Sequence, residues 1–154
     1  MNATTKPAIA PAAQHATVLA FDFGTRRIGV AVGNMAVRIA HPLTTIVGEA
    51  NAPRFAAIDT LVAQWEPGSL LVGRPVSEDG TVQDMTARAE RFARQLEGRY
   101  GLPVTCADER FTSRAAVTVL AEAGVRGRAR LGAKDEVAAQ LILQSWLDEQ
   151  GPPG

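Results

Sequence analysis

The stretch that most constrains the fold runs from residue 18 to residue 32, where two β-rich runs flank a short turn. The first run covers residues 18–23, the second covers residues 28–32, and Gly24 begins the turn between them. Runs of this kind separated by a short breaker segment are typical of antiparallel strands joined by a tight turn. The sequence therefore predicts a β-hairpin near the start of the chain.

Asp22 is the anomaly of this hairpin. Strand alternation places it on the same face as Val18 and Ala20, so that a lone carboxylate ends an otherwise apolar face. An unpaired buried carboxylate is costly, and a bound cation would offset its charge and use its oxygens as ligands. The alternative is that the Asp22 side chain caps the turn. Both interpretations stay open on the strand alone.

Sequence periodicity divides the rest of the chain into further strands and helices. The predicted strands cover residues 37–40 and 43–47 (one strand interrupted at His41-Pro42), 69–73 and 103–108. The predicted helices cover residues 52–65 after an N-cap at Asn51, 81–99, 112–123 and 134–149. Three strands followed by helices alternating with two more strands predict an α/β fold, with a mixed five-stranded sheet flanked by helices.

Length and composition limit the classes of protein that fit. The 154 residues suit one domain at 17–150 behind a flexible tail at 1–16 that lacks the pattern of a secretory signal. The single cysteine, Cys106, excludes an intrachain disulfide and a cysteine-based zinc cluster. No apolar run approaches the roughly 18 to 20 residues that cross a membrane. We therefore expect a cytoplasmic protein without a membrane partner.

Positive charge is concentrated late in the chain, although 16 Lys and Arg balance 16 Asp and Glu overall. The basic residues of this segment are Arg110, Arg114, Arg126, Arg128, Arg130 and Lys134. They form a candidate phosphate-binding surface, and the alternative is a solvated basic loop. Arg26 and Arg74 complete the predicted nucleic-acid contacts.

Two further acidic positions resemble Asp22. Helical periodicity places Asp135 at the head of an apolar stripe, and Glu136, Gln140 and Gln144 are expected to point away from that stripe. The simpler explanation of Asp135 is that a negative charge is favourable in the first turn of a helix. That explanation would apply equally to an aspartate on the exposed face of the helix. A third carboxylate follows the strand at 103–108, where either Asp108 or Glu109 can supply it.

Carboxylates from two strand ends and one helix form the kind of oxygen cluster that binds Mg²⁺ or Mn²⁺. Two such ions about 4 Å apart can activate a water and stabilise the leaving oxygen in phosphodiester hydrolysis. No general-base histidine is then required.

Four ordered motifs resemble those of the YqgF-type family of pre-16S rRNA nucleases, also called Holliday junction resolvase-like proteins. The motifs are DFGTRRIGVA at 22–31, VGRP at 72–75 with DGT at 79–81, DERFTS at 108–113 and KDEVAA at 134–139. The resemblance implies a ribonuclease H-like fold and a metal-dependent nuclease that matures the 5′ end of small-subunit rRNA. It also implies that Asp22, Glu109 and Asp135 are the catalytic, metal-binding residues.

Three alternatives to an rRNA nuclease follow from the same residues. An Asp-x-Gly-Thr turn also begins the phosphate loop of actin-like ATPases and sugar kinases, but those enzymes close two domains over the nucleotide. A non-catalytic RNA-binding module for ribosome assembly would keep the same fold. Within the nucleases, a four-way DNA junction is the alternative substrate. The expected partners are therefore structured RNA, the ribosome or branched DNA, bound by a monomer or a homodimer.

Overall fold

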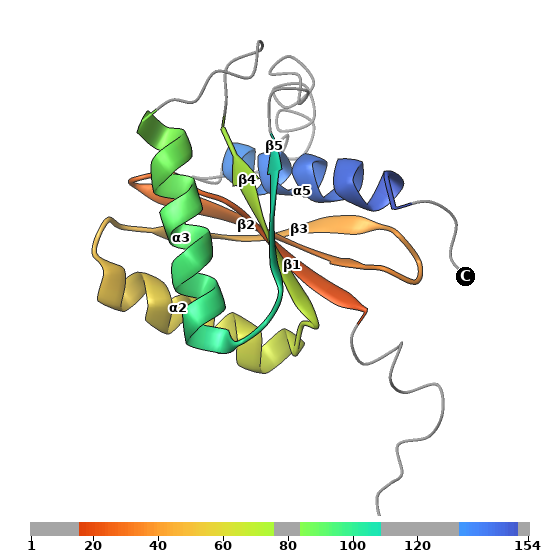
Figure 1. The fold of residues 1–154 in the computed structure, drawn as a ribbon, viewed down its shortest axis with the longest axis horizontal. Helices are drawn as coiled ribbons and strands as arrows, with labels where there is room; N and C mark the ends of the chain where they lie inside the picture. The colour runs from red at the N-terminus through yellow and green to blue at the C-terminus, as the bar shows by residue number, and fades with distance from the viewer. Residues whose placement is uncertain (1–15, 76–83, 109–132, 151–154) are drawn as a thin grey trace, which may run out of the picture.

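A mixed β-sheet with helices on both faces forms the framework of the computed structural model, which describes residues 16–75, 84–108 and 133–150 (Figure 1). In chain order its elements are β1 (Thr17–Asp22), β2 (Arg27–Asn34), β3 (Ala40–Val47), α2 (Asn51–Trp65), β4 (Ser69–Arg74), α3 (Asp84–Tyr100), β5 (Val104–Asp108) and α5 (Ala133–Asp148). The predicted helix at 112–123, the tail up to residue 15 and most of the basic segment lie outside the described residues. No helix in the described part of the chain is long and apolar enough to cross a membrane.

The five strands lie in the order β3-β2-β1-β4-β5. β1 pairs antiparallel with β2 and parallel with β4, and β5 continues the parallel half of the sheet. The predicted hairpin and the predicted mixed five-stranded sheet are therefore confirmed. Because β1, β4 and β5 run in the same direction, their last residues Asp22, Arg74 and Asp108 lie at one end of the sheet, where β2 begins at Arg27.

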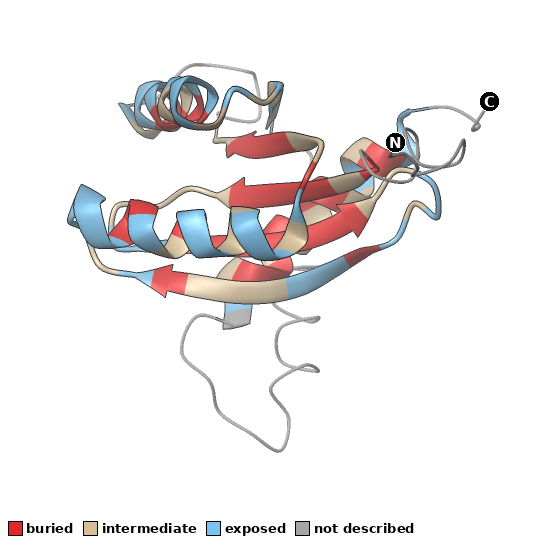
Figure 2. Ribbon diagram, turned by 90° about the horizontal axis from the view of Figure 1, so that it is seen from below, coloured by how far each residue is buried: buried red, intermediate tan, exposed pale blue. Residues whose placement is uncertain are grey.

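Each face of the sheet has its own hydrophobic core, because successive strand residues point to opposite faces. Leu19 and Phe21 of β1 pack with the apolar residues of α2 and α3, whereas Val18 and Ala20 pack with those of α5. The outer surfaces of the helices are exposed, and the buried residues are concentrated in the strands (Figure 2). Since Asp22 follows Val18 and Ala20 at intervals of two, its side chain lies on the α5 face.

Two local predictions were wrong in detail. The third strand is continuous, with His41 and Pro42 inside β3, because this edge strand tolerates proline and shifts its register opposite Val30 and Ala31. The N-cap of α2 is Ala50, which has extended backbone dihedrals, and Asn51 is already helical. The predicted end of that helix is confirmed, since Glu66 is left-handed with φ 47°.

The predicted outward orientation of the polar residues of α5 was also wrong. Glu136 is almost fully buried and accepts a 2.9 Å hydrogen bond from the hydroxyl of Thr45 on β3. Gln140 donates to the carbonyl of Ala40, and Gln144 accepts from the Ala40 amide and donates to the carbonyl of Arg38. Glu136 therefore binds a side chain of the edge strand β3, whereas Gln140 and Gln144 bind backbone groups of β3 and of the segment just before it. α5 is polar on this buried side.

Gln144 makes the most hydrogen bonds of this set, so we expect Gln144→Met to lower the free energy of unfolding. Methionine has a similar volume but leaves the Ala40 amide and the Arg38 carbonyl without this partner, a loss of about 1 to 3 kcal/mol. Urea denaturation measures the change, and Gln64→Met on the exposed side of α2 is the matched control. Equal stability of the two variants would contradict a structural role for Gln144.

An ion pair joins α2 to the end of α3 and makes stability depend on pH. Hydrogen bonds from Arg99 and then from Tyr100 lower the pKa of Asp59 from 3.8 to about 2. A carboxyl with a lowered folded-state pKa stabilises the fold above its unfolded pKa, and this contribution is lost as the pH falls through the folded value. The stability difference between wild type and Asp59→Asn should therefore be constant at neutral pH and shrink between pH 3.8 and about pH 2. Urea titrations across this range measure it, and a difference independent of pH would refute the assignment.

Candidate active site at the end of the sheet

Asp22 lies at the last position of β1, between two glycines. Its partner in β2 is Gly29, and its partner in β4 is Gly73. Directly paired residues of neighbouring strands project to the same face of a sheet. No side chain of either neighbouring strand therefore flanks the half-buried Asp22.

Gly29 also brings the first turn of α5 against the sheet. A Cβ atom at this position would lie 1.9 Å from the backbone oxygen of Asp135 and 2.9 Å from the Cβ of Asp135. Only glycine permits so close an approach of helix and strand. Because Gly29 is paired with Asp22, this contact places Asp135 beside Asp22, although they are 113 positions apart in the sequence.

Arg27 is a site residue that the sequence did not predict. Its Nε donates a 2.7 Å hydrogen bond to Oδ2 of Asp135, and both side chains are partly exposed. Arg27 is the first residue of β2, two positions before Gly29. The only signal in the sequence was its place in the turn after Asp22, which does not identify a partner so distant in the chain.

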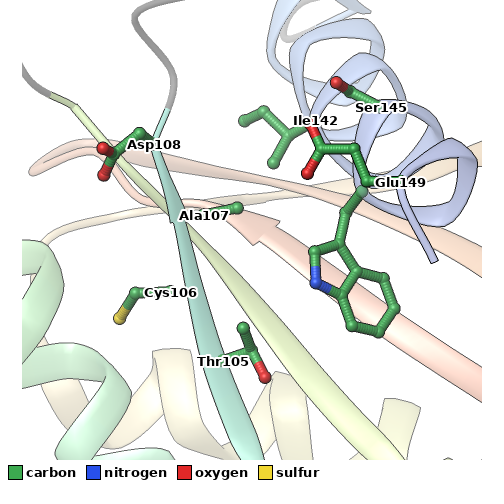
Figure 3. Close-up of a pocket in the computed structure, with 8 residues that line it drawn as sticks. Thr105, Cys106, Ala107, Asp108, Ile142, Ser145 and Glu149 are labelled. Carbon is green, nitrogen blue, oxygen red and sulfur yellow. The ribbon is translucent and has the colours of Figure 1, made fainter.

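Asp108 points away from this site. On β5 it is paired with Arg74, and Nη1 of Arg74 donates a 2.8 Å hydrogen bond to Oδ1 of Asp108 while its Nε donates to Glu90 of α3. Hydrogen bonds to Asp108 and then to Glu90 raise the pKa of Arg74. Figure 3 shows Asp108 and Cys106 on the α3 side of β5, whereas Ala107 points towards Ile142 of α5. Asp108 therefore has a structural partner on the opposite face from Asp22.

The other predicted site residues divide into two groups. Arg26 and Lys134 are exposed at the same end of the molecule, and Arg26 lies 4.0 Å from Glu49. Residues outside the described part of the chain are Glu109, Arg110, Arg114, Arg126, Arg128 and Arg130. Within the described ranges, no three His, Cys, Asp or Glu side chains are grouped closely enough to hold a metal ion.

A cavity of about 310 Å³ lies between β5 and the last turns of α5 (Figure 3). Its lining includes Thr105, Asp108, Ser145, Trp146 and Glu149. Neither Asp22 nor Asp135 lines this cavity. It is therefore separate from the candidate site at Asp22 and Asp135.

Comparison with known proteins identifies related sequences. A family model described as "RuvX: Holliday junction resolvase" matches residues 16–149. A protein of Nitrosomonas europaea named "Putative pre-16S rRNA nuclease" is 51% identical over 136 residues, which cover 88% of this chain and 92% of that protein. A protein of Burkholderia cenocepacia with the same name is 50% identical over 137 residues, covering 89% and 92% of the two chains.

Solved structures show the same fold at much lower identity. The Thermus thermophilus RuvC in complex with a Holliday junction substrate aligns with a TM-score of 0.53 at 16% identity, covering 86% of this chain and 94% of that one. The fowlpox virus resolvase in complex with Holliday junction DNA aligns with a TM-score of 0.56 at 7% identity, covering 86% and 97%. These alignments confirm the predicted ribonuclease H-like fold and show that it resembles the fold of RuvC. With a family match over nearly all the described residues and relatives at about half identity, the chain belongs to the RuvX family, also called the YqgF family.

Proposed function

We propose that this protein is a metal-dependent nuclease that hydrolyses phosphodiester bonds in the 5′-end processing of pre-16S rRNA. The names of relatives about 50% identical over 89% of the chain support the substrate. The observation that carries the chemistry is the placement of Asp22 between Gly29 and Gly73, with the first turn of α5 and Asp135 packed directly on Gly29. The reaction would take place in the cytoplasm, where ribosomes are assembled.

The donor set suits Mg²⁺ or Mn²⁺, because both ions prefer carboxylate oxygens and retain water ligands. Asp22 and Asp135 would each supply carboxylate oxygens beside a backbone that lacks side chains at Gly29 and Gly73. Glu109 is the proposed third carboxylate, because Asp108 is bound to Arg74 on the opposite face of the sheet. When bound, such ions make a water nucleophilic and stabilise charge on the leaving oxygen.

The chain's own residues position this chemistry. Asp22 is fixed at the end of a strand that is hydrogen-bonded on both sides, and Asp135 is fixed by the contact of α5 with Gly29. Arg27 holds one oxygen of Asp135 and balances its charge. Two acidic side chains held on rigid elements need little rearrangement to bind an ion, and such preorganisation favours the transition state.

A four-way DNA junction is the second candidate substrate, because the matching family model is described as a Holliday junction resolvase. The experiment that separates the candidates incubates the pure protein with a structured rRNA precursor and, in parallel, with a DNA junction. Each reaction is run with Mn²⁺, with Mg²⁺ and with EDTA. We expect ion-dependent cleavage at the 5′ end of the RNA. Preferential cleavage of the junction would establish the second candidate, and binding without cleavage of either would favour a non-catalytic ribosome-assembly module.

A further inference from the structure

A second polar hollow lies at the same end of the molecule but on the other face of the sheet. It encloses about 420 Å³ between the turn after β1, the first turns of α2 and the first half of α3. Its lining includes Phe23, Glu49, Arg54, Arg88, Arg91 and Phe92. We call this hollow the arginine groove, because among the described residues that line it three are arginines and Glu49 is the single acid.

Arg54 is the fixed part of the arginine groove. It is 5% exposed, its Nε donates to the carbonyl of Gly48, and its Nη2 donates to the carbonyls of Gly24 and Thr25. The guanidinium also lies 5.4 Å from the centroid of the Phe23 ring, which supports a cation–π contact. Burial lowers the pKa of Arg54, but an arginine remains charged in proteins. A permanent positive charge is thus built into the floor of the groove and holds the turn after β1 in shape.

Arg88 and Arg91 are the accessible part of the groove. Both are exposed on α3, three residues apart, so their side chains project from neighbouring positions of one helix face. Arg88 pairs with Asp84 at 3.1 Å, a contact between exposed groups that contributes little. Within the described residues Arg91 forms no ion pair. Two guanidiniums spaced in this way can contact adjacent phosphates of one strand, and each can bind a phosphate through two hydrogen bonds.

The groove begins one residue after the proposed catalytic Asp22. Asp22 faces α5, and the next residue, Phe23, faces α2 and α3, where its ring packs on Phe92 at 5.0 Å. Consecutive Cα atoms are about 3.8 Å apart, so the wall of the groove begins within a few ångströms of the backbone of Asp22. No other residue intervenes in the chain between the carboxylate and the wall of the groove.

We propose that the arginine groove binds the phosphate backbone of the nucleic-acid substrate beside the cleavage site, with Arg88 and Arg91 as its phosphate contacts. This inference rests on the proposed nuclease function, because it takes the strand cleaved at Asp22 as the ligand. It assigns substrate contacts to α3 in addition to those expected in the basic segment at 110–134. Contacts of this kind position the strand without reading its sequence.

The test measures binding in EDTA, so that it does not depend on cleavage. The probes are a fluorescein-labelled single-stranded RNA and a labelled four-way DNA junction, titrated at several salt concentrations with full-length protein. We expect Arg88→Gln/Arg91→Gln to weaken binding about tenfold and to reduce the slope of log K against log salt by about 1 to 2. The probe with the larger loss identifies which nucleic acid occupies the groove.

The matched control is Arg94→Gln, which removes an exposed arginine of the same helix that lines a different hollow. It should leave the affinity and the salt slope unchanged. Equal affinities of the double variant and the control, or no measurable binding of either probe by wild type, would overturn the proposal. If the double variant binds more weakly than wild type, but wild type cleaves neither substrate with Mn²⁺, only the proposed catalytic function is refuted.

Discussion

Asp22→Asn is expected to abolish phosphodiester hydrolysis and to leave the fold intact. Asparagine keeps the shape of the side chain but removes the charge that we propose holds the metal ions, so the rate should fall roughly 10³-fold or more. Asp22 is half-buried between two glycines, and its replacement displaces no packed neighbour on the adjacent strands. In EDTA the variant should melt at or above the wild-type temperature, because carboxylates that converge without a metal repel each other.

The measurement is the initial rate of cleavage of a structured rRNA precursor with Mn²⁺, together with the melting temperature in EDTA. Asp148→Asn is the matched control, because it makes the same chemical change at the exposed end of α5, where Asp148 accepts one hydrogen bond from Gln144. Wild-type activity in Asp22→Asn would exclude Asp22 from catalysis. If Asp22→Asn unfolds, the loss of activity reflects the loss of the fold, and the expectation that the fold stays intact is wrong.

Gly29→Ala is expected to destabilise the fold by about 3 kcal/mol, which is the upper part of the range for overpacked sites. The added methyl group would lie 1.9 Å from the backbone oxygen of Asp135 and 2.3 Å from its carbonyl carbon. Backbone atoms cannot swing aside as the end of a flexible side chain can, so the first turn of α5 must move away from β2. That movement also separates Asp135 from Asp22, and cleavage should decline with stability.

Gly98→Ala is the control for this substitution. Gly98 lies in α3 with nothing within 4 Å of an added Cβ, so alanine should raise the free energy of unfolding by up to about 1 kcal/mol through its helix propensity. Urea denaturation of the three proteins measures both effects. Equal stability of Gly29→Ala and wild type would show that α5 does not depend on close contact with β2.

Local patterns predicted the framework well, because each relies on neighbouring residues. The alternation of residues 18–23 identified β1 and placed Asp22 on one face, and the segment Glu66-Pro67-Gly68 after residue 65 marked the end of α2 where the structure ends it. The apolar run before Gly73 identified β4 as a buried strand. These features follow from strand and helix periodicity and from turn residues.

The orientation of α5 could not be obtained in this way. Helical periodicity defines the angular spacing of side chains, but the choice of the buried side depends on what the helix packs against. Here the partner includes the edge strand β3, and Gln140 and Gln144 bind backbone groups on and just before it. Polar residues on a helix can therefore be buried when a neighbouring strand offers them hydrogen-bond partners.

The sequence predicted that Asp22, Glu109 and Asp135 share one site, but not the contacts that bring Asp22 and Asp135 to the same end of the sheet. Asp22 and Asp135 were identified as anomalous carboxylates, whereas the glycine contact that joins them and the ion pair of Arg27 with Asp135 depend on the pairing of β2 with α5. Such contacts link segments more than a hundred residues apart. Only the packing of the chain shows which of several acidic residues share a face, and it separates Asp108 from Asp22.

Whether Asp22 and Asp135 hold the same divalent ion can be measured directly as the shift in melting temperature that Mn²⁺ produces without nucleic acid. An ion that binds only the folded state stabilises that state. Once the ion concentration exceeds the dissociation constant, the stabilisation grows with the logarithm of the concentration. We expect Mn²⁺ to raise the melting temperature of wild type. Asp22→Asn and Asp135→Asn should each lose this rise, and the double variant should lose no more than either single variant. A wild-type Mn²⁺ shift in either single variant would contradict a shared metal site.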